Sequence, residues 1–477
     1  MPPVLIPIAG ALAAGAIGVT IGVVTVNAVI VSVVATAAAA GLQYLLAEKP
    51  VTSGYSQAAQ AAPSNGERNI PVRQATPARR FALGEVRTGG AIFIQDNDNP
   101  NLYIGAVLSD GPIAGIDRVF FGQTEVILNA TLGGTGLFTN KYQAEFGLGD
   151  PTQTASPLLL GVAAFAGYVD ANYRQQGCAR AIARLNWGTD AQNNSVLWGN
   201  SLSPSYVVRG VLCYDPRDGA QVLADPTTWK YTANGPLLTA FVLTHVWGSP
   251  LANADIDWAS VGAAATVADA AVTYNGASYP IYVTGGIFAA EAEISAQVNQ
   301  LLQSFGGAIT LDNGLYRIDA DQARTSVFTI TDDDVLAVGD LTHAAATEDL
   351  FGAISAQYYD INDSGQQATT PVFAVGAGDQ RETTVALSYS AASHSAQILA
   401  YRALMKSRAG KTLSLTITDA GIYLLPFVDL VTVASTAATF LNGTYEILQV
   451  DLQPEGVTLR LREYAPTAYA DPATYLQ

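Results

Sequence analysis

Residues 91–108 read AIFIQDNDNPNLYIGAVL, two short apolar runs on either side of a polar stretch. The runs at 91–95 and 102–108 have the length and composition of β-strands, and DNDNPN between them is rich in residues that favour turns. The pattern continues with DGP at 110–112 and QTEVIL at 123–128. This part of the chain therefore predicts strands joined by tight turns.

Helix signals are few, and the strongest lies at 289–307, AAEAEISAQVNQLLQSFGG. It leads into AITLDNGLYRI (308–318), where Asn313-Gly314 predicts a hairpin turn. A second helix is predicted from about Ser393 to Arg408, with Ser393 as its cap and Lys406 near its C-terminus. The apolar residues that share one face of the first helix are Ile294, Val298, Leu301, Leu302 and Phe305.

The last part of the chain returns to strand patterns. They occur at 412–421 (TLSLTITDAG), 428–433 (VDLVTV) and 443–464, a hairpin that turns at Pro454-Glu455-Gly456. The sequence as a whole predicts a mainly β protein with α+β parts.

Composition points to an assembly. Only 13% of residues are charged and 49% are hydrophobic, so we expect other subunits to cover large faces, although an alanine-rich genome would also contribute to this composition. The formal net charge of −17 disfavours adhesion to nucleic acid. Cys178 and Cys213 provide neither a disulfide framework nor a metal motif and are interpreted as ordinary buried thiols.

No constellation for catalysis is found. His245, His343 and His394 fit no ligand pattern, and no nucleophile or phosphate-loop motif is present. The stretch 95–101 (QDNDNPN) resembles a calcium loop but lacks the required glycine and distal glutamate, so a turn is favoured. The run 332–334 (DDD) is interpreted as a solvated loop rather than a divalent site. We therefore predict no catalytic, cofactor or metal residues, and a structural protein rather than an enzyme.

The N-terminal stretch has no charged residue before Glu48, and its core, 15–41, reads GAIGVTIGVVTVNAVIVSVVATAAAAG. It is too long for a signal peptide and lacks a basic start. Its length suits membrane contact, whereas its missing basic flanks and β-branched content favour burial in an assembly, and both alternatives stay open. Gly18 and Gly22 would permit close approach of segments. A Ser/Ala/Gln/Pro-rich linker follows from Val51.

Four segments in order carry a resemblance: 84–95 (GEVRTGGAIFIQ), 103–126 (YIGAVLSDGPIAGIDRVFFGQTEV), 178–187 (CARAIARLNW) and 206–219 (YVVRGVLCYDPRDG). They resemble the hub portion of siphophage tail-tip proteins, the family of the phage lambda host-specificity protein J. The resemblance covers about residues 84 to 470, although 426–429 reads Pro-Phe-Val-Asp where the family usually has Pro-Gly-Asp. The motif residues are Arg87, Gly89 and Gly90; Asp110, Gly111 and Gly115; and Arg209, Gly210, Tyr214, Asp215, Pro216 and Arg217.

The resemblance implies two tail-tube-like β-barrel or sandwich domains with a smaller α/β insert, after an apolar N-terminal segment. The expected division is 1–50 for the apolar segment, 51–83 for the linker, 84–235 for the first β-rich hub domains, 236–340 for the helix-containing α/β domain and 341–477 for the second tube-like domain.

The implied function is a non-enzymatic tail-tip or baseplate hub, assembled in the host cytoplasm, that closes the tail tube and opens for release of the tape measure and DNA. The implied partners are two further copies in a homotrimer, the distal tail protein ring, the tape measure protein, other tail-tip proteins and separate fibre or receptor-binding proteins. DNA would pass without specific binding. The N-terminal residues expected to form a plug or to contact the host membrane are Ile17, Gly18, Val19, Ile21, Gly22 and Val23.

Two other interpretations stay open. The N-terminal run is also compatible with a membrane-anchored bacterial surface or secretion-system structural protein. A hub that carries a cell-wall hydrolase is disfavoured because the catalytic groups are missing.

Overall fold

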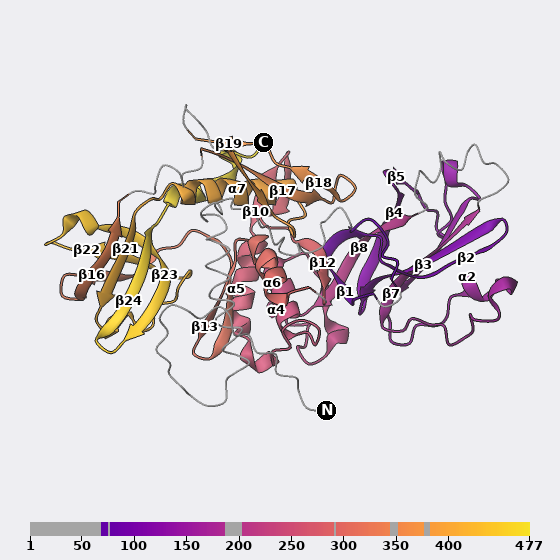
Figure 1. Cartoon of the computed structure of the whole chain (residues 1–477), viewed down its shortest axis with the longest axis horizontal. Coiled ribbons are helices and arrows are strands. Elements are labelled where there is room, and N and C mark those ends of the chain that lie inside the picture. The colour runs from indigo at the N-terminus through magenta and orange to yellow at the C-terminus, as the bar shows by residue number, and fades with distance from the viewer. Residues whose placement is uncertain (1–67, 75–76, 187–202, 291, 344–351, 376–381) are drawn as a thin grey trace, which may run out of the picture.

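The computed structural model describes residues 68–74, 77–186, 203–290, 292–343, 352–375 and 382–477. The residues named for the N-terminal segment, and most of the linker, lie outside these ranges. Strand residues outnumber helical residues, which confirms the mainly β class with α+β parts. Figure 1 shows a β-rich part, a central part that contains the longer helices and a second β-rich part, side by side along the longest axis.

Two sheets form the first β-rich part. One has the order β12-β1-β8-β4-β5, with β9 beside β8, and the other has the order β2-β3-β7-β6. The first comprises β1 (Arg80–Thr88), β4 (Ile113–Phe121), β5 (Thr124–Glu125), β8 (Pro204–Cys213), β9 (Lys230–Tyr231) and β12 (Gly285–Ala289). The second comprises β2 (Ala91–Asp98), β3 (Asn101–Asp110), β6 (Tyr142–Leu148) and β7 (Cys178–Asn186).

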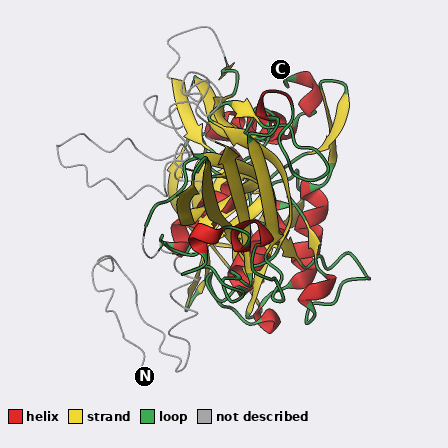
Figure 2. Cartoon of the chain, turned by 90° about the vertical axis from the view of Figure 1, so that its right-hand side faces the viewer, coloured by secondary structure: helices red, strands yellow, loops and turns green. Residues whose placement is uncertain are grey.

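Alternating side chains make these two sheets a sandwich. Ile104 and Leu108 from β3 and Ala181 from β7 share one buried cluster with Val119 from β4 and Val208 from β8. Figure 2 views the molecule from this end. The strands predicted at 91–95 and 102–108 are confirmed, whereas only Thr124–Glu125 of the 123–128 run is a strand.

The outer face of the second sheet is covered by the chain between β6 and β7. This segment carries α2 (Pro157–Leu160) and the 3₁₀ turn η3 (Ala163–Phe165). Leu159 and Phe165 pack there against Tyr103 and Ile182. The covering segment explains why β3 and β7 are buried on both faces.

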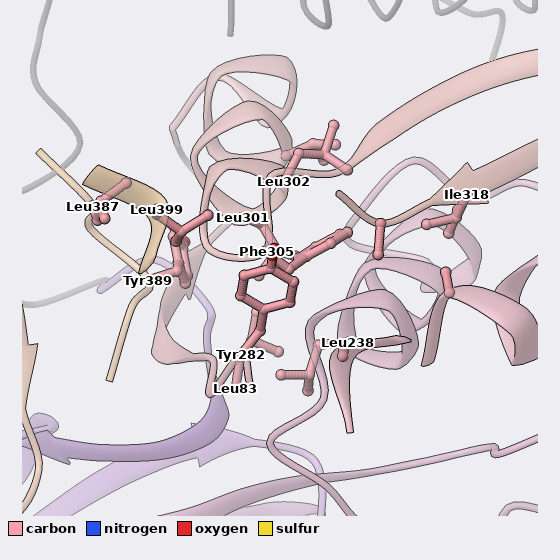
Figure 3. Close-up of a cluster of buried hydrophobic side chains, with 14 of the residues drawn as sticks. Leu83, Leu238, Tyr282, Leu301, Leu302, Phe305, Ile318, Leu387, Tyr389 and Leu399 are labelled. Atoms are coloured by element: carbon pink, nitrogen blue, oxygen red, sulfur yellow. The ribbon is translucent and has the colours of Figure 1, made fainter. Parts of the chain in front are cut away.

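The central part is built on α4 (Gly235–Thr244), α5 (Trp258–Ala268) and α6 (Ile294–Gln303), with the hairpins β10 (Ala271–Tyr274)–β11 (Ala277–Pro280) and β13 (Ala308–Asp312)–β14 (Leu315–Asp319). Asn234 and Asp257 cap α4 and α5 by accepting main-chain N–H bonds. The predicted turn at Asn313-Gly314 is confirmed, with φ of 50° and 83°. The predicted apolar face of α6 is buried, and Leu301, Leu302 and Phe305 point into the core with Tyr282 (Figure 3).

A long helix, α7 (Ser393–Ser407), crosses the top of the central part in Figure 1 and packs on a small sheet. That sheet comprises β17 (Ala353–Asp360), β18 (Gln366–Thr369), β19 (Phe373–Ala374) and β20 (Glu382–Ala386). The helix prediction is confirmed, but Ser393 as its cap is wrong. Ala392 holds the cap position, and the Ser393 hydroxyl accepts a bond from Gln397 Nε2 at 3.0 Å.

The second β-rich part is one sheet with the order β15-β22-β23-β24-β21-β16. Its strands are β15 (Ser326–Thr331), β16 (Val335–Thr342), β21 (Thr412–Ile417), β22 (Leu430–Ala434), β23 (Gly443–Gln453) and β24 (Gly456–Glu463). Val431, Tyr445, Leu459 and Leu415 are buried in one cluster, so the sheet curls around its own core. No sheet in the described part of the chain closes into a barrel. The sheet joins strands from both sides of the expected boundary at residues 340 and 341; the domain limits themselves stay predictions.

The remaining short elements are 3₁₀ turns: η2 (Gly136–Phe138), η4 (Pro226–Thr228), η5 (Asn253–Asp255), η6 (Asp419–Gly421), η7 (Thr439–Leu441), η8 (Pro466–Tyr469) and η9 (Pro472–Thr474).

Candidate functional site

Arg87 is the motif residue with the most extensive contacts. Its buried guanidinium donates to Ser205 Oγ at 2.9 Å, to the main-chain oxygen of Gly122 at 2.5 Å and to the main-chain oxygen of Ser364 at 2.9 Å, and it lies 4.3 Å from the ring centre of Phe120. Burial, together with the nearby charge of Arg118, lowers the pKa of Arg87 to about 10. Arg87 therefore links the first sandwich to the turn between β17 and β18.

Two further contacts reinforce this seam, the contact between the first sandwich and the β17–β18 turn. Arg118 donates to the main-chain oxygen of Ile361 at 2.5 Å, and Ile361 packs on Phe120. A Cβ on Gly365 would lie 2.7 Å from Arg87 Cβ, so the turn needs glycine there, also because its φ is +63°. The seam is specific in shape as well as in hydrogen bonding.

The motif glycines serve close backbone approach. A Cβ on Gly89 would lie 2.4 Å from the Pro71 nitrogen, and one on Gly210 would lie 2.0 Å from the Ala82 oxygen. Gly90 has φ +68° and faces the Val107 oxygen. These positions fix the packing of the first sandwich and do not surround a ligand cavity.

Asp110, Gly111 and Gly115 lie at the β3–β4 turn and its exit. Asp110 pairs with Arg79 at 2.7 Å and lies 3.7 Å from Cys178 Sγ. Gly111 has φ +79° and bonds through its N–H to the Gly177 oxygen at 2.8 Å. The half-buried Cys178 and the buried Cys213 are free thiols, and burial raises the pKa of both.

Arg209 on β8 forms a bidentate pair with Asp117 on β4, at 2.8 and 3.1 Å. The hydrogen bond and charge of Asp117 raise the pKa of Arg209. A Cβ at Gly115 would come within 2.6 Å of the Arg209 guanidinium, so this glycine leaves room for the pair. Both partners are exposed, which limits the contribution of the pair to stability.

Residues 214–217 connect the first sandwich to α5. The Tyr214 ring meets Trp258 edge-on at 5.1 Å, and Arg217 pairs with Asp215 at 2.7 Å and with Asp269 at 2.8 Å. Trp258 and Asp269 lie at the two ends of α5. Pro216 and Arg217 form one wall of an open groove of about 390 Å³ whose other wall is the exposed side of α5.

The motif residues thus lie in four places and not in one pocket. Arg87 and the 214–217 segment contact the central part, whereas Asp110 and Arg209 stay within the sandwich. What these residues share is that each contacts other groups of the protein and so holds strands, turns or helices in place. In the described ranges, no three His, Cys, Asp or Glu side chains gather in a way that could hold a metal ion.

The three histidines occupy structural positions. His245 lies edge-on to Phe81 at 4.6 Å, His343 lies near Phe440, and the His394 ring nitrogen Nε2 is 2.8 Å from the Pro280 oxygen. Burial lowers the pKa of His245 and His394. Asp332, from the acidic run, accepts hydrogen bonds from the 435–437 segment and stabilises a turn.

Sequence reasoning missed a second set of contacts, centred on Asp321, Arg324 and Lys406. Asp321 and Lys406 pair at 2.7 Å, and Arg324 donates to the Phe427 oxygen at 3.1 Å. Asp321 and Lys406 are 85 positions apart in the sequence, and Arg324 and Phe427 are 103 positions apart. No local pattern therefore links the members of either pair. The one signal in the sequence is the four-residue spacing of Arg402 and Lys406, which places both on one face of the predicted helix.

The six residues named for the plug lie outside the described residues, and their placement stays a prediction. Among the helices of the described chain, none combines the length and the apolar character needed to span a membrane.

Comparison with known proteins gives a family match over part of the chain. Residues 293–450, from just before α6 into β23, match the family described as putative phage tail protein. No curated protein matches the chain.

The fold has a counterpart among solved structures. It is similar to a chain of the native gene transfer agent virion, with TM-score 0.60 and 14% identity over 91% of this chain and 93% of that one. Two tail proteins match less well. One is from Neisseria meningitidis MC58 (TM-score 0.32, 14% identity, 83% and 95% covered). The other is a 43 kDa prophage MuSo2 protein from Shewanella oneidensis (0.30, 11%, 83% and 96%). Together, the family match and the fold support a structural protein of a phage tail.

Proposed function

We propose that this protein is the tail-tip hub of a tailed phage, a ring-forming subunit that closes the tail tube and opens when the tape measure and DNA leave. The observation that carries the proposal is the fold shared with a virion chain over 91% of this chain, together with the tail-protein match at 293–450. A membrane-anchored surface protein accounts for neither finding.

The two β-rich parts supply the reason for a trimer. A sixfold tube can end on a threefold ring if each chain contributes two β units to it. The first sandwich and the curled C-terminal sheet, on either side of the central part in Figure 1, are the candidates for these units. A closed ring of identical chains also avoids open-ended polymerisation.

The proposed partners follow from the proposed place of the protein at the end of the tail tube. The distal tail protein ring would lie above the hub, the tape measure inside it, and separate fibre or receptor-binding proteins around it. The chain has 40 acidic and 23 basic residues, and an acidic surface repels a passing polyanion instead of retaining it. The arginines of the described sites are bound to protein groups, which suits orientation of domains rather than catalysis.

For the N-terminal segment we propose a plug. Three copies would bundle near the ring axis against the end of the tape measure, with Gly18 and Gly22 allowing close approach. On opening, the same apolar surface would enter the host membrane, the other environment that accepts it. This role is separate from the hub role and has its own test.

The hub role is tested in a phage that lacks the gene. Without the protein, tails should fail to complete, and a copy with a small C-terminal tag, supplied in trans, should restore infectivity and place gold-labelled antibody at one tail end only. Label along the whole tail would contradict the proposal. A copy that lacks residues 1–48 should restore tails but leave them leaky or poor at DNA ejection; normal infectivity from it would refute the plug.

A further inference from the structure

Four segments connect the central part to the C-terminal sheet. They are 320–325, 343–352, 408–411 and 464–465, and the second includes residues beyond the described ranges. The sheet is therefore assembled from two pieces of chain, 326–342 and 412–463, that leave and re-enter the central part. Its orientation depends on what holds these connections together.

A single carboxylate lies on the first connection and contacts residues next to the third and the fourth. Asp321 lies on the first; its Oδ1 is 2.7 Å from Lys406 Nζ and accepts a hydrogen bond from the Tyr469 hydroxyl at 2.7 Å. Arg402 Nη1 lies 3.4 Å from Oδ2. Arg402 and Lys406 belong to the end of α7, just before the third connection, and Tyr469 ends η8, just after the fourth.

The groups in this cluster are charged and largely removed from water. The side chains of Asp321 and Arg402 are each 9% exposed, and that of Lys406 is 17% exposed. Burial disfavours the ionised carboxyl, but the charges of Lys406 and Arg402 outweigh it and hold the pKa of Asp321 below its ordinary value. Removing the carboxylate charge would leave two cations buried without their partner.

Arg324 adds a second set of bonds on the same connection. Its guanidinium donates to the main-chain oxygens of Phe427 and Val428. Its main-chain N–H donates to the Tyr464 hydroxyl at 3.3 Å. Next to it lies a cavity of about 60 Å³ lined by polar side chains, which include Asp319 and Glu446, and by apolar ones, which include Val428 and Leu448. Polar groups thus bond the junction beside a small internal space.

Apolar packing does not join the two parts across this junction. Among the described residues, the buried apolar cluster of the central part, which contains Leu404 and Ile318, is separate from that of the C-terminal sheet, which contains Leu413 and Ile330. Two units with their own cores and a polar junction can change orientation without losing either core.

We propose that Asp321 is a latch, which holds the C-terminal sheet in one orientation on the central part until its contacts with α7 and η8 are broken. The latch is a property of the isolated chain. Its use, to let one β unit of the ring swing aside as the tube opens, rests on the proposed hub function.

Distances between spin labels in the purified full chain test the latch. With Cys178 and Cys213 replaced by serine, labels at Ala277→Cys and Leu452→Cys report on the orientation of the sheet, because these exposed residues lie in β11 and β23. A second pair, Tyr423→Cys and Leu452→Cys, reports on the C-terminal sheet alone.

In the Asp321→Asn chain we expect the distribution of the 277–452 distance to widen about twofold or more, while that of the 423–452 distance stays unchanged. Tyr469→Phe, which removes one donor and keeps both cations, should widen the first distance less. The matched control is Asp215→Asn, because Asp215 pairs with Arg217 at 2.7 Å away from this junction and its replacement should leave both distances unaltered.

Two results would overturn the latch. If Asp321→Asn and Tyr469→Phe both leave the 277–452 distance unchanged, the cluster does not set the orientation. If the 423–452 distance widens as well, Asp321 is required for folding and is no latch. Neither result concerns where the protein lies in the particle, so the hub function is tested separately.

Discussion

The Arg87 guanidinium donates a 2.9 Å hydrogen bond to the main-chain oxygen of Ser364, a residue 277 positions further along the chain. With its bonds to Ser205 and Gly122, this contact makes Arg87 the main polar link between the first sandwich and the β17–β18 turn. We expect Arg87→Ala to lower the free energy of unfolding by about 3 kcal/mol, because it takes this partner from the buried Ser205 hydroxyl and removes the bonds to the less buried Gly122 and Ser364 oxygens.

Urea unfolding measures this loss, and Arg209→Ala is the matched control. It removes an arginine from the neighbouring pair with Asp117, which is solvent-exposed, so its cost should stay below about 1 kcal/mol and shrink in high salt. Equal costs for the two variants would show that the Arg87 contacts do not stabilise the seam.

Phe427 occupies a backbone conformation that residues other than glycine rarely adopt, with φ +63°. Its half-buried ring compensates for part of the backbone strain. Phe427→Gly should therefore change stability by no more than about 1 kcal/mol, whereas Phe427→Val should destabilise by about 2 kcal/mol or more, because a β-branched residue tolerates this φ poorly. Thermal or urea unfolding of the two variants tests the order, and a valine variant as stable as the parent would contradict it.

Asp332 makes the stability of the second β-rich part depend on pH. Hydrogen bonds from Ser435 and Thr436 lower its pKa from 3.8 to about 2 in the folded chain. Because the folded pKa lies below the unfolded one, this stabilisation is complete above about pH 4 and is lost as the pH falls toward 2. Asp332→Asn should remove that part of the pH dependence. The control Asp333→Asn, which keeps these hydrogen bonds, should retain it, and identical profiles for the two variants would contradict the assignment.

The purified protein should not retain duplex DNA. With a formal charge of −17, it should show no retardation of a DNA fragment near physiological salt. An electrophoretic mobility assay measures this directly. Binding that weakens steeply with added salt would reveal a basic face and refute free passage of DNA.

Local sequence signals predicted several of the regular elements, but not all of them. The alternation at 91–108, the apolar face of α6 and Asn313-Gly314 all predicted what is observed, because each depends on neighbours in the chain. The prediction of Ser393 as the cap of α7 was wrong because Ser393 already lies inside the helix. Residue type alone does not fix a helix boundary.

The contacts between parts could not be predicted in the same way. Arg87 stood out through its motif, but its partner Ser364 has no distinctive neighbourhood in the sequence. The Asp321 cluster joins the first connection to residues of α7 and η8 that are distant along the chain, so it emerges only once the two cores are in place. The open form of the C-terminal sheet likewise depends on how β15 and β16 end at opposite edges.

The proposed hub forms a threefold ring at the tip of a phage tail. A reconstruction of the tail end, calculated without imposed symmetry, can count its copies. We expect three copies in one ring, with the two β-rich parts of each chain alternating around six positions. Six copies, a single copy, or density for this chain repeated along the tube would contradict it.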